Sequence, residues 1–333
     1  MIHNYNVKKI LVTGGMGFIG SNFLLECCRQ FPNIEFINVD NLSYATSSMT
    51  NDELNLYKNY SFHNLDICNL SDLEAIFCSN DIDLIVHFAA ESHVDNSIEA
   101  PLKFINTNIL GTFNLLTVLK QQSDNGKNIF FHHISTDEVY GSLNKEDCPF
   151  TEASNFAPSS PYSASKASSD LLVEAWGKTY DLRYLITNCS NNFGPRQFCE
   201  KLVPKVILNC INKEKIPIYG SGLNIRDWLF VGDHIDAILS LYDKGLFIND
   251  RFNIGGGHEV TNIEMVKAIL QILDKKYGFK DSEQLIEYVK DRKGHDFRYS
   301  IDSTKLETAT GWKPATSFNQ QLEITVKWYV ENS

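Results

Sequence analysis

The sequence predicts an α/β protein in which a doubly wound parallel sheet is followed by a smaller C-terminal α/β domain. Short runs of β-branched and aromatic residues alternate with helical patterns from residue 8 to residue 190. One of these runs, 83–90, is apolar almost throughout, which is typical of a parallel strand covered by helices on both faces. A glycine-rich turn at 14–20 joins the first strand to the first helix. These three features together indicate the fold class.

The composition is that of an ordinary globular protein. The 333 residues are 43% hydrophobic and 21% charged, and their formal charge of −11 argues against a nucleic-acid surface. No apolar run reaches the roughly 18 residues that a membrane-spanning helix needs, and residues 1–6 lack the apolar part of a signal peptide. The eight cysteines include no Cys-x-x-Cys pair, and the nine histidines have no metal-ligand spacing. We therefore expect a reduced, cytoplasmic protein without a metal site.

The first strand–helix unit predicts a dinucleotide site of the Rossmann type. An apolar strand over 8–13 is followed by Gly14, Gly17 and Gly20 and then by a helix. Glycines at this point permit a tight turn and let the backbone approach a pyrophosphate at the helix N-terminus. A second strand ends in Asp40, an acid that would accept the ribose hydroxyls of NAD and repel the 2′-phosphate of NADP. The alternative is an acid that caps a turn at the strand end.

Further strands are expected over 61–67, 83–90, 129–136 and 183–188. The helix expected over 101–121 begins with a proline and is apolar on more than one face. This pattern predicts either a two-sided core helix or a helix with one core face and one subunit-interface face.

After residue 190 the alternation of strands and helices ends. Residues 191–195 have the composition of a loop, and shorter strands are expected over 216–220, 226–231 and 251–256. We expect a cofactor domain over 1–190, with a returning segment near 225–258. A substrate domain is expected over 191–224 and 259–333.

The strand over 129–136 carries the chemistry. It ends at Thr136 and is followed directly by Asp137 and Glu138. The carboxyl ends of strands are where open α/β sheets bind ligands. Tyr162 and Lys166 follow with the i,i+4 spacing of one helix face. An ammonium beside the phenol would favour the phenolate, which predicts Tyr162 as a base near neutral pH. Two adjacent carboxyls repel each other, so one is expected to be protonated while the other is ionised.

These motifs resemble the extended short-chain dehydrogenases/reductases that act on nucleotide sugars, and within them the dTDP-glucose 4,6-dehydratases. The resemblance covers essentially the whole chain and rests on residues 13–21, 89–95, 135–141, 160–170, 188–192, 225–228 and 291–296. The Thr-Asp-Glu triplet is its most specific part, because nucleotide-sugar 4-epimerases of this fold usually lack the acid pair. Three positions depart from the family pattern. Asn41 stands where Lys is frequent, and Arg196 and Cys199 replace a usual aromatic residue and a usual proline.

The resemblance implies an NAD-dependent lyase that converts a nucleotide-diphosphate glucose, dTDP-glucose first among them, to the 4-keto-6-deoxy sugar. The steps would be oxidation at C4, elimination of water across C5 and C6, and hydride return to C6. Tyr162 and Lys166 would serve the oxidation, Asp137 and Glu138 the elimination, and Thr136 would bind the C4 oxygen. UDP-glucose as the substrate and a 4-epimerase activity stay open as alternatives. The family also implies a homodimer joined through a four-helix bundle.

Two residue sets follow from the glycine unit and the resemblance. The residues expected to hold NAD are Gly14, Gly17, Phe18, Ile19, Gly20, Asp40, Asn41, Leu42, Ser43, Asp66, Ile67, Ala89, Ala90, Thr107, Tyr162, Lys166 and Asn192. The residues expected to hold the nucleotide sugar are Ser92, Thr136, Asn191, Lys201, Leu202, Pro217, Ile218, Tyr219, Arg226, Asn262, Arg292 and His295. Within the second set, Lys201, Arg226 and His295 offer cationic groups for a diphosphate in an otherwise acidic protein.

Overall fold

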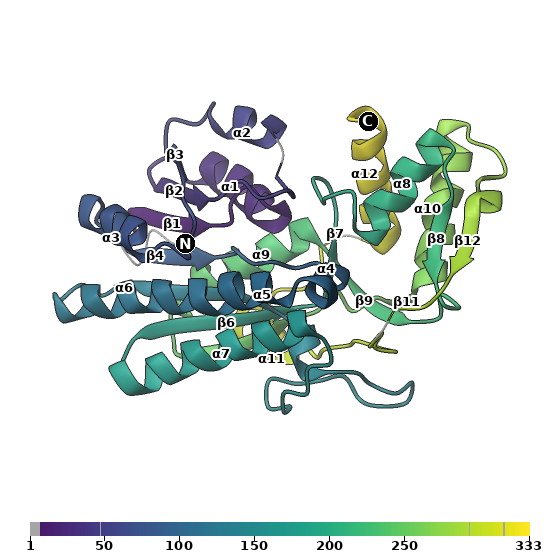
Figure 1. Cartoon of the computed structure of the whole chain (residues 1–333). Coiled ribbons are helices and arrows are strands. Elements are labelled where there is room, and N and C mark those ends of the chain that lie inside the picture. The colour runs from purple at the N-terminus through teal and green to yellow at the C-terminus, as the bar shows by residue number, and fades with distance from the viewer. Residues whose placement is uncertain (1–6, 47, 293, 316) are drawn as a thin grey trace.

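Seven parallel strands form the central sheet of the computed structural model, which describes residues 7–46, 48–292, 294–315 and 317–333 (Figure 1). The strand order is β10-β6-β5-β4-β1-β2-β3, and every neighbouring pair is parallel. The strands are β1 (Lys9–Thr13), β2 (Glu35–Asp40), β3 (Tyr60–Asn64), β4 (Leu84–His87), β5 (Phe130–Thr136), β6 (Arg183–Cys189) and β10 (Asp250–Ile254). The predicted fold class is therefore confirmed. Lys293 of the 291–296 motif and residues 1–6 lie outside the described residues.

Helices cover both faces of the sheet because its strands are apolar on both sides. In β1, Ile10 and Val12 pack into one core with α1 and α9, whereas Leu11 points into the opposite core with α3, α6 (Thr112–Asp124) and α7. The helices of this part are α1 (Phe18–Gln30), α2 (Ser48–Leu54), α3 (Leu70–Ser79), α4 (Val94–Glu99), α7 (Pro161–Tyr180), α9 (Val231–Asp243) and α11 (Thr304–Thr310). The sheet is thus doubly wound.

The helix predicted over 101–121 has three parts. They are α5 (Pro101–Phe104), a π-helical segment (Ile105–Gly111) and α6 (Thr112–Asp124). Leu102, Ile105 and Leu110 are 66%, 49% and 43% exposed. The interpretation as a two-sided core helix is therefore wrong for the single chain, because one apolar face stays open to solvent. In Figure 1, α6 runs beside α7 along the same side of the sheet.

A smaller, mixed part of the chain lies at the carboxyl edge of the sheet (Figure 1). Its strands are β7 (Asn191–Phe193), β9 (Ile225–Phe230) and β11 (Glu259–Thr261) in one sheet and β8 (Ile216–Tyr219) and β12 (Ile286–Val289) in another. Its helices α8 (Leu202–Asn212), α10 (Asn262–Tyr277) and α12 (Phe318–Glu331) enclose a separate apolar core. The loop predicted over 191–195 is wrong for its first three residues, which pair in parallel with β9.

The segment near 225–258, predicted to return to the cofactor domain, contributes strands to two different sheets. β10 joins the edge of the seven-stranded sheet, whereas β9 belongs to the three-stranded sheet. The division of the chain into two domains at the stated boundaries stays a prediction. None of the helices in the described ranges is long and apolar enough to cross a membrane.

Candidate active site

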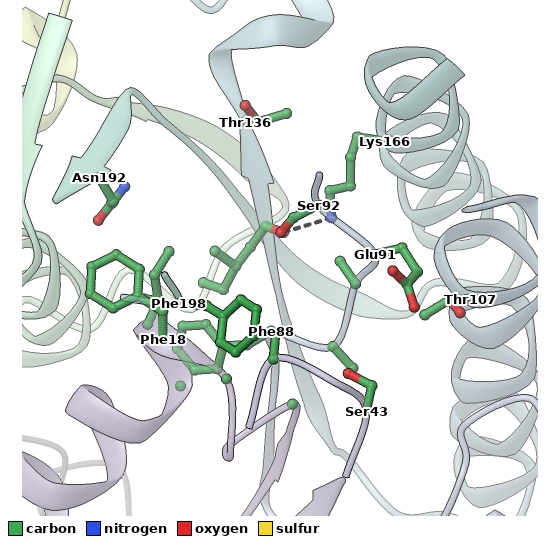
Figure 2. A pocket seen from close by; sticks show the side chains of 18 of the residues that line it. Phe18, Ser43, Phe88, Glu91, Ser92, Thr107, Thr136, Lys166, Asn192 and Phe198 are labelled. Carbon is green, nitrogen blue, oxygen red and sulfur yellow. Dashed lines mark hydrogen bonds between the residues drawn. The ribbon is translucent and has the colours of Figure 1, made fainter. Parts of the chain in front are cut away.

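A cavity opens at the carboxyl ends of β1, β2, β4 and β5, and Figure 2 shows part of its lining. The glycine turn, the end of β2, the loop after β4 and the start of α7 meet there. The predicted cofactor residues that line it are Gly14, Gly17, Phe18, Ile19, Gly20, Asp40, Asn41, Ser43, Ile67, Ala89, Ala90, Thr107, Tyr162, Lys166 and Asn192. Leu42 and Asp66 do not line it.

The glycine turn leaves no room for side chains where it meets the neighbouring loop. Gly14 has a φ of +72°, and a Cβ on it would lie 2.5 Å from the backbone of Ala89. A Cβ on Gly20 would lie 2.4 Å from the carbonyl oxygen of Gly14. No side chain caps α1 at Gly17, so the first amides of this 13-residue helix remain available to an anion. The turn therefore fits a dinucleotide pyrophosphate.

Asp40 caps the turn and still faces the cavity. Its Oδ2 accepts the backbone N–H of Met16 and its Oδ1 that of Leu42, each at 2.9 Å. Burial raises the pKa of this carboxyl, and the two backbone hydrogen bonds oppose that shift. The turn-capping alternative is therefore correct as a description of the contacts. It leaves ribose binding open, because a carboxylate has about four acceptor sites and two of them are used here.

The carboxylate of Asp66 does not line the cavity and instead contacts the loop that follows β3. Its carboxylate accepts the N–H of Cys68 at 2.8 Å and the side-chain amide of Asn41 at 3.2 Å. These contacts shape the loop after β3, and they keep Asn41 on the cavity wall.

The acid pair lies at the end of β5, where Thr136 caps a short 3₁₀ turn (Asp137–Tyr140). The Thr136 hydroxyl donates to Asp137 Oδ1 at 3.2 Å and accepts the N–H of Glu138 at 3.3 Å. Asp137 is buried, and its Oδ2 has no hydrogen-bond partner among the described residues. Burial and the neighbouring Glu138 raise the pKa of Asp137 well above its usual value.

Glu138 differs from its neighbour in its surroundings. Burial raises the pKa of this half-buried carboxyl as well, but the charges of Arg226 and Lys201 oppose the rise. The two carboxyls are therefore unequal. Both carboxyls have a raised pKa, and that of Asp137 is raised further.

The expected effect of Lys166 on Tyr162 does not occur in the protein alone. The Lys166 ammonium donates to the carbonyl of Ile134 at 2.8 Å, drawn as a dashed line in Figure 2. Burial lowers the pKa of Lys166 to about 8. Burial, and then the charge of Glu138, raise the pKa of Tyr162 well above its usual value. Burial and the nearby carboxylate therefore act against the expected phenolate in the protein alone, and the role of Tyr162 as a base stays a prediction.

A second cavity continues from the first toward the smaller part of the chain. It is lined by all but one of the predicted substrate residues, namely Ser92, Asn191, Lys201, Leu202, Pro217, Ile218, Tyr219, Arg226, Asn262, Arg292 and His295. The remaining one, Thr136, lines the first cavity. Both cavities share Glu138, which places the acid pair where they meet.

Three cations converge on the second cavity. Lys201 donates to the carbonyl of Ser92 at 2.8 Å. Arg226 lies 4.3 Å from the ring centre of Tyr299 and donates to the carbonyl of Asp296 at 3.0 Å. The third cation, Arg292, lies 4.7 Å from the ring centre of Tyr219 and 3.4 Å from a carboxylate oxygen of Asp95. A cationic wall in an acidic protein suits a diphosphate.

His295 contributes less charge than the sequence suggested. Burial lowers its pKa, and its Nδ1 lies 2.7 Å from Asp291 Oδ1. The hydrogen bond to Asp291 opposes the shift. The neutral imidazole can still donate or accept a hydrogen bond at the cavity wall.

Several lining residues were absent from the predictions. They include Phe88, Phe198 and Glu91; in Figure 2 the rings of Phe88 and Phe198 lie near that of the predicted Phe18, and Glu91 lies near the predicted Thr107 on the other side of the cavity. Phe88 directly follows β4, so a rule that counts residues after each strand would have found it. Phe198 comes from the loop after β7, and no local pattern connects it to the glycine turn.

A buried network of hydrogen bonds and ion pairs holds the backbone of Thr136 in place. Asn188 on β6 donates its side-chain amide to the Thr136 carbonyl at 2.9 Å. Arg251 on β10 donates to Asn188 at 2.6 Å and to Asp170 on α7 at 2.7 Å. Asp170 also lies 3.2 Å from His133 Nε2. The end of β5 is thereby tied to α7, which carries Tyr162 and Lys166.

Comparisons with known proteins agree on one family. A family model described as GDP-mannose 4,6 dehydratase matches residues 11–325. The dTDP-glucose 4,6-dehydratase of Neisseria meningitidis serogroup B is 47% identical, with 98% of this chain and 94% of that protein covered. The crystal structure of the dTDP-glucose 4,6-dehydratase from Bacillus anthracis in complex with NAD is 42% identical, with a TM-score of 0.86 and 98% and 97% of the two chains covered.

A further solved structure, the dTDP-glucose 4,6-dehydratase of Streptomyces venezuelae with NAD and TYD bound, is 38% identical. Its TM-score is 0.88, and 97% of each chain is covered. The similarity extends over nearly the full length in all these cases, and it agrees with the acid pair, the glycine turn and the Tyr-Lys helix described above. This chain belongs to the dTDP-glucose 4,6-dehydratase family of the extended short-chain dehydrogenases/reductases.

Proposed function

We propose that the protein is an NAD-dependent hydro-lyase that converts dTDP-glucose to its 4-keto-6-deoxy sugar. The observation that carries the proposal is the unequal acid pair at the junction of the two cavities. Elimination of water needs one protonated and one ionised carboxyl at the same time, and the pKa of Asp137, which is raised further than that of Glu138, suits it to be the protonated one. The full-length similarity to dTDP-glucose 4,6-dehydratases supports the same reaction.

The first cavity fits NAD. Its glycine turn leaves the first amides of α1 free for a pyrophosphate, and Asp40 and Asn192 line the cavity wall. NAD, when bound, supplies the hydride acceptor for C4, the hydride donor for C6 and a positively charged ring. Burial and Glu138 raise the pKa of Tyr162 in the protein alone. The positive charge of the bound ring would favour the phenolate and so oppose that rise.

The oxidation is assigned to Tyr162, which takes the proton of the sugar C4 hydroxyl as hydride leaves C4. Thr136 donates a hydrogen bond to the C4 oxygen while the ketone forms. Lys166, held by the Ile134 carbonyl, stays fixed one helical turn from Tyr162. The new 4-ketone makes the hydrogen on C5 acidic enough for a carboxylate to remove.

The elimination is assigned to the acid pair. Glu138 removes the C5 proton while Asp137 protonates the C6 hydroxyl, and water leaves. Hydride return to C6 and proton return to C5 from Glu138 complete the product. The proton that Tyr162 took from C4 balances the one that Asp137 gave up, so the net change is the loss of one water.

The alternatives differ in ways that one assay resolves. UDP-glucose differs from the dTDP sugar by a ring methyl and a ribose hydroxyl, and a 4-epimerase would leave the acid pair without a role. The protein is incubated with each nucleotide sugar, and the loss of one water is followed by mass spectrometry. Conversion of dTDP-glucose with loss of water is expected. Conversion without mass change would contradict the dehydratase assignment.

Glu138→Gln separates oxidation from elimination. Glutamine keeps the size of the side chain but cannot act as a base, so product formation should fall by about 10²–10⁴-fold. Tyr162 and Lys166 are untouched, so absorbance of reduced nicotinamide should accumulate on adding dTDP-glucose. The matched variant Tyr162→Phe should form neither product nor reduced nicotinamide. Turnover of Glu138→Gln at the wild-type rate would show that the acid pair has no catalytic role.

We further propose a homodimer. The exposed apolar residues Leu102, Ile105, Leu110 and Phe113 lie along α5, the π-helical segment and α6, and Leu171 lies on α7. Two copies of this helix pair would bury those residues in a four-helix bundle. A cytoplasmic location is proposed as well, and it is supported by the eight cysteines, all of which are free thiols in the described part of the chain.

A further inference from the structure

Two loops from distant parts of the chain meet over the cofactor cavity. Ser43, Ala45 and Thr46 line it from the loop after β2, and Gln197 and Phe198 line it from the loop after β7. The two loops are far apart in sequence, so only folding brings them together. Both loops would therefore border a dinucleotide in the first cavity.

One contact between the loops is made by Tyr44. Its hydroxyl donates to Glu200 Oε1 at 2.9 Å, and its ring meets that of Phe198 edge-on at a centroid distance of 5.5 Å. The side-chain amide of Asn96 donates to the same hydroxyl at 3.1 Å. Burial and the hydrogen bond to Glu200 raise the pKa of Tyr44, so the phenol keeps its proton and remains a donor.

A second contact is an ion pair between Arg196 and Glu53 of α2, and the carbonyls of Pro195 and Gln197 in the same loop accept hydrogen bonds from Asn22 and Tyr329. Arg196 Nη2 lies 2.6 Å from Glu53 Oε2, and the two side chains are 13% and 39% exposed. The guanidinium also lies 5.6 Å from the ring centre of Trp328 on α12. Arg196 adopts a left-handed backbone with a φ of +71°, which is uncommon for a residue other than glycine. Such a conformation persists where surrounding contacts hold it, and these two contacts do so.

We propose that residues 195–200 form a strap over the cofactor cavity, and that Arg196 and Glu200 are positioning residues that hold it closed through Glu53 and Tyr44. Opening of either contact then speeds the release of bound NAD. The inference rests on the proposed function, in which NAD is regenerated in every cycle and its retention does not slow turnover.

The test measures NAD release from the holoenzyme. The protein is loaded with labelled NAD, chased with excess unlabelled NAD, and the retained label is followed over time. Arg196→Gln and Glu53→Gln should each release label about fivefold faster, the change expected when closure loses one partly exposed ion pair. Tyr44→Phe removes a single hydroxyl with little risk to folding and should change release in the same direction.

Three controls separate the strap from general destabilisation. The double variant Arg196→Glu with Glu53→Arg restores an ion pair of reversed sign and should release label more slowly than either single charge reversal. Lys276→Gln removes an exposed pair of similar length, 2.7 Å to Glu323, between α10 and α12 and should leave release unchanged. Added salt should speed release from the wild type, because it screens a half-exposed pair, and should do so less in Arg196→Gln.

The outcomes distinguish the strap from the cofactor site itself. Wild-type protein that retains no label would overturn the NAD site and the strap with it. Label retained by the wild type and released at the same rate from Arg196→Gln, Glu53→Gln and Tyr44→Phe would overturn the strap alone.

Discussion

Replacing Arg251 by methionine tests how strongly the buried ion network supports the reaction centre. Arg251 Nη1 donates to Asp170 at 2.7 Å and to Asn188 at 2.6 Å, and Asn188 donates to the carbonyl of Thr136. The Asp170 side chain is 0% exposed. Methionine fills a similar length of space but carries no charge, so Asp170 loses its cationic partner without a large cavity being formed.

The magnitude follows from which contacts are buried. Breaking a buried ion pair by removing one partner costs about 3–5 kcal/mol, because the remaining charge is left uncompensated. Arg251 also contacts Glu174 at 2.8 Å, but that side chain is 27% exposed. Its loss should add at most about 1 kcal/mol. We therefore expect the free energy of unfolding to fall by about 3–5 kcal/mol near neutral pH.

Acidification should narrow the difference between the two proteins. Burial raises the pKa of Asp170, but the hydrogen bond from His133 and the charge of Arg251 outweigh it and hold that pKa well below its usual range. A depressed pKa contributes stability above the unfolded value of about 3.9. That contribution is lost as the pH falls through and below this value. Arg251→Met removes much of this contribution, so its disadvantage should be largest near neutral pH and smaller in acid.

Urea unfolding followed by circular dichroism measures the effect. The double variant Arg251→Met with Asp170→Asn should recover part of the loss, because the uncompensated charge is gone. Lys276→Met, which breaks the exposed pair with Glu323, is the matched control and should cost less than about 1 kcal/mol. A loss below that level in Arg251→Met, or no recovery in the double variant, would refute the account of the network.

Two further predictions concern the cofactor and the assembly. Asp40→Asn keeps a hydrogen-bonding side chain but removes the negative charge, so the protein should bind NAD less tightly and should prefer NAD over NADP by a smaller factor. Titration with both dinucleotides measures the two affinities. An unchanged ratio of affinities would contradict the role of the carboxylate. Leu102→Glu should turn a dimer into a monomer in light scattering, because a charge would enter the proposed four-helix bundle. The control Leu56→Glu changes a residue that is 82% exposed and lies outside that face, so the dimer should stay intact. A monomeric wild type would rule the bundle out.

Local patterns were enough to predict the central elements of the site. The glycine turn, the acid at the end of β2 and the Thr136 triplet at the end of β5 are encoded within a few residues each. Alternation of apolar runs with helical patterns then brings all strand ends to the same edge of a parallel sheet. For that reason Gly14, Asp40 and Tyr162 line one cavity, as expected from the sequence.

Short or irregular elements escaped prediction. β7 has three residues, which is too short for an alternating pattern to show, and it exists because Asn191–Phe193 pair with β9 across the fold. The π-helical segment at Ile105–Gly111 interrupts a sequence that reads as one regular helix.

The charge state of the reaction centre was decided by tertiary structure. From spacing alone, Lys166 should have lowered the pKa of Tyr162, yet the lysine is held by the Ile134 carbonyl and the phenol lies in a buried site near Glu138. The strap has the same origin, since Arg196 and Glu53 are 143 residues apart in sequence. A sequence pattern specifies which groups reach an edge of the sheet. Their protonation depends on burial and on charges from other elements, and only the folded chain brings those together.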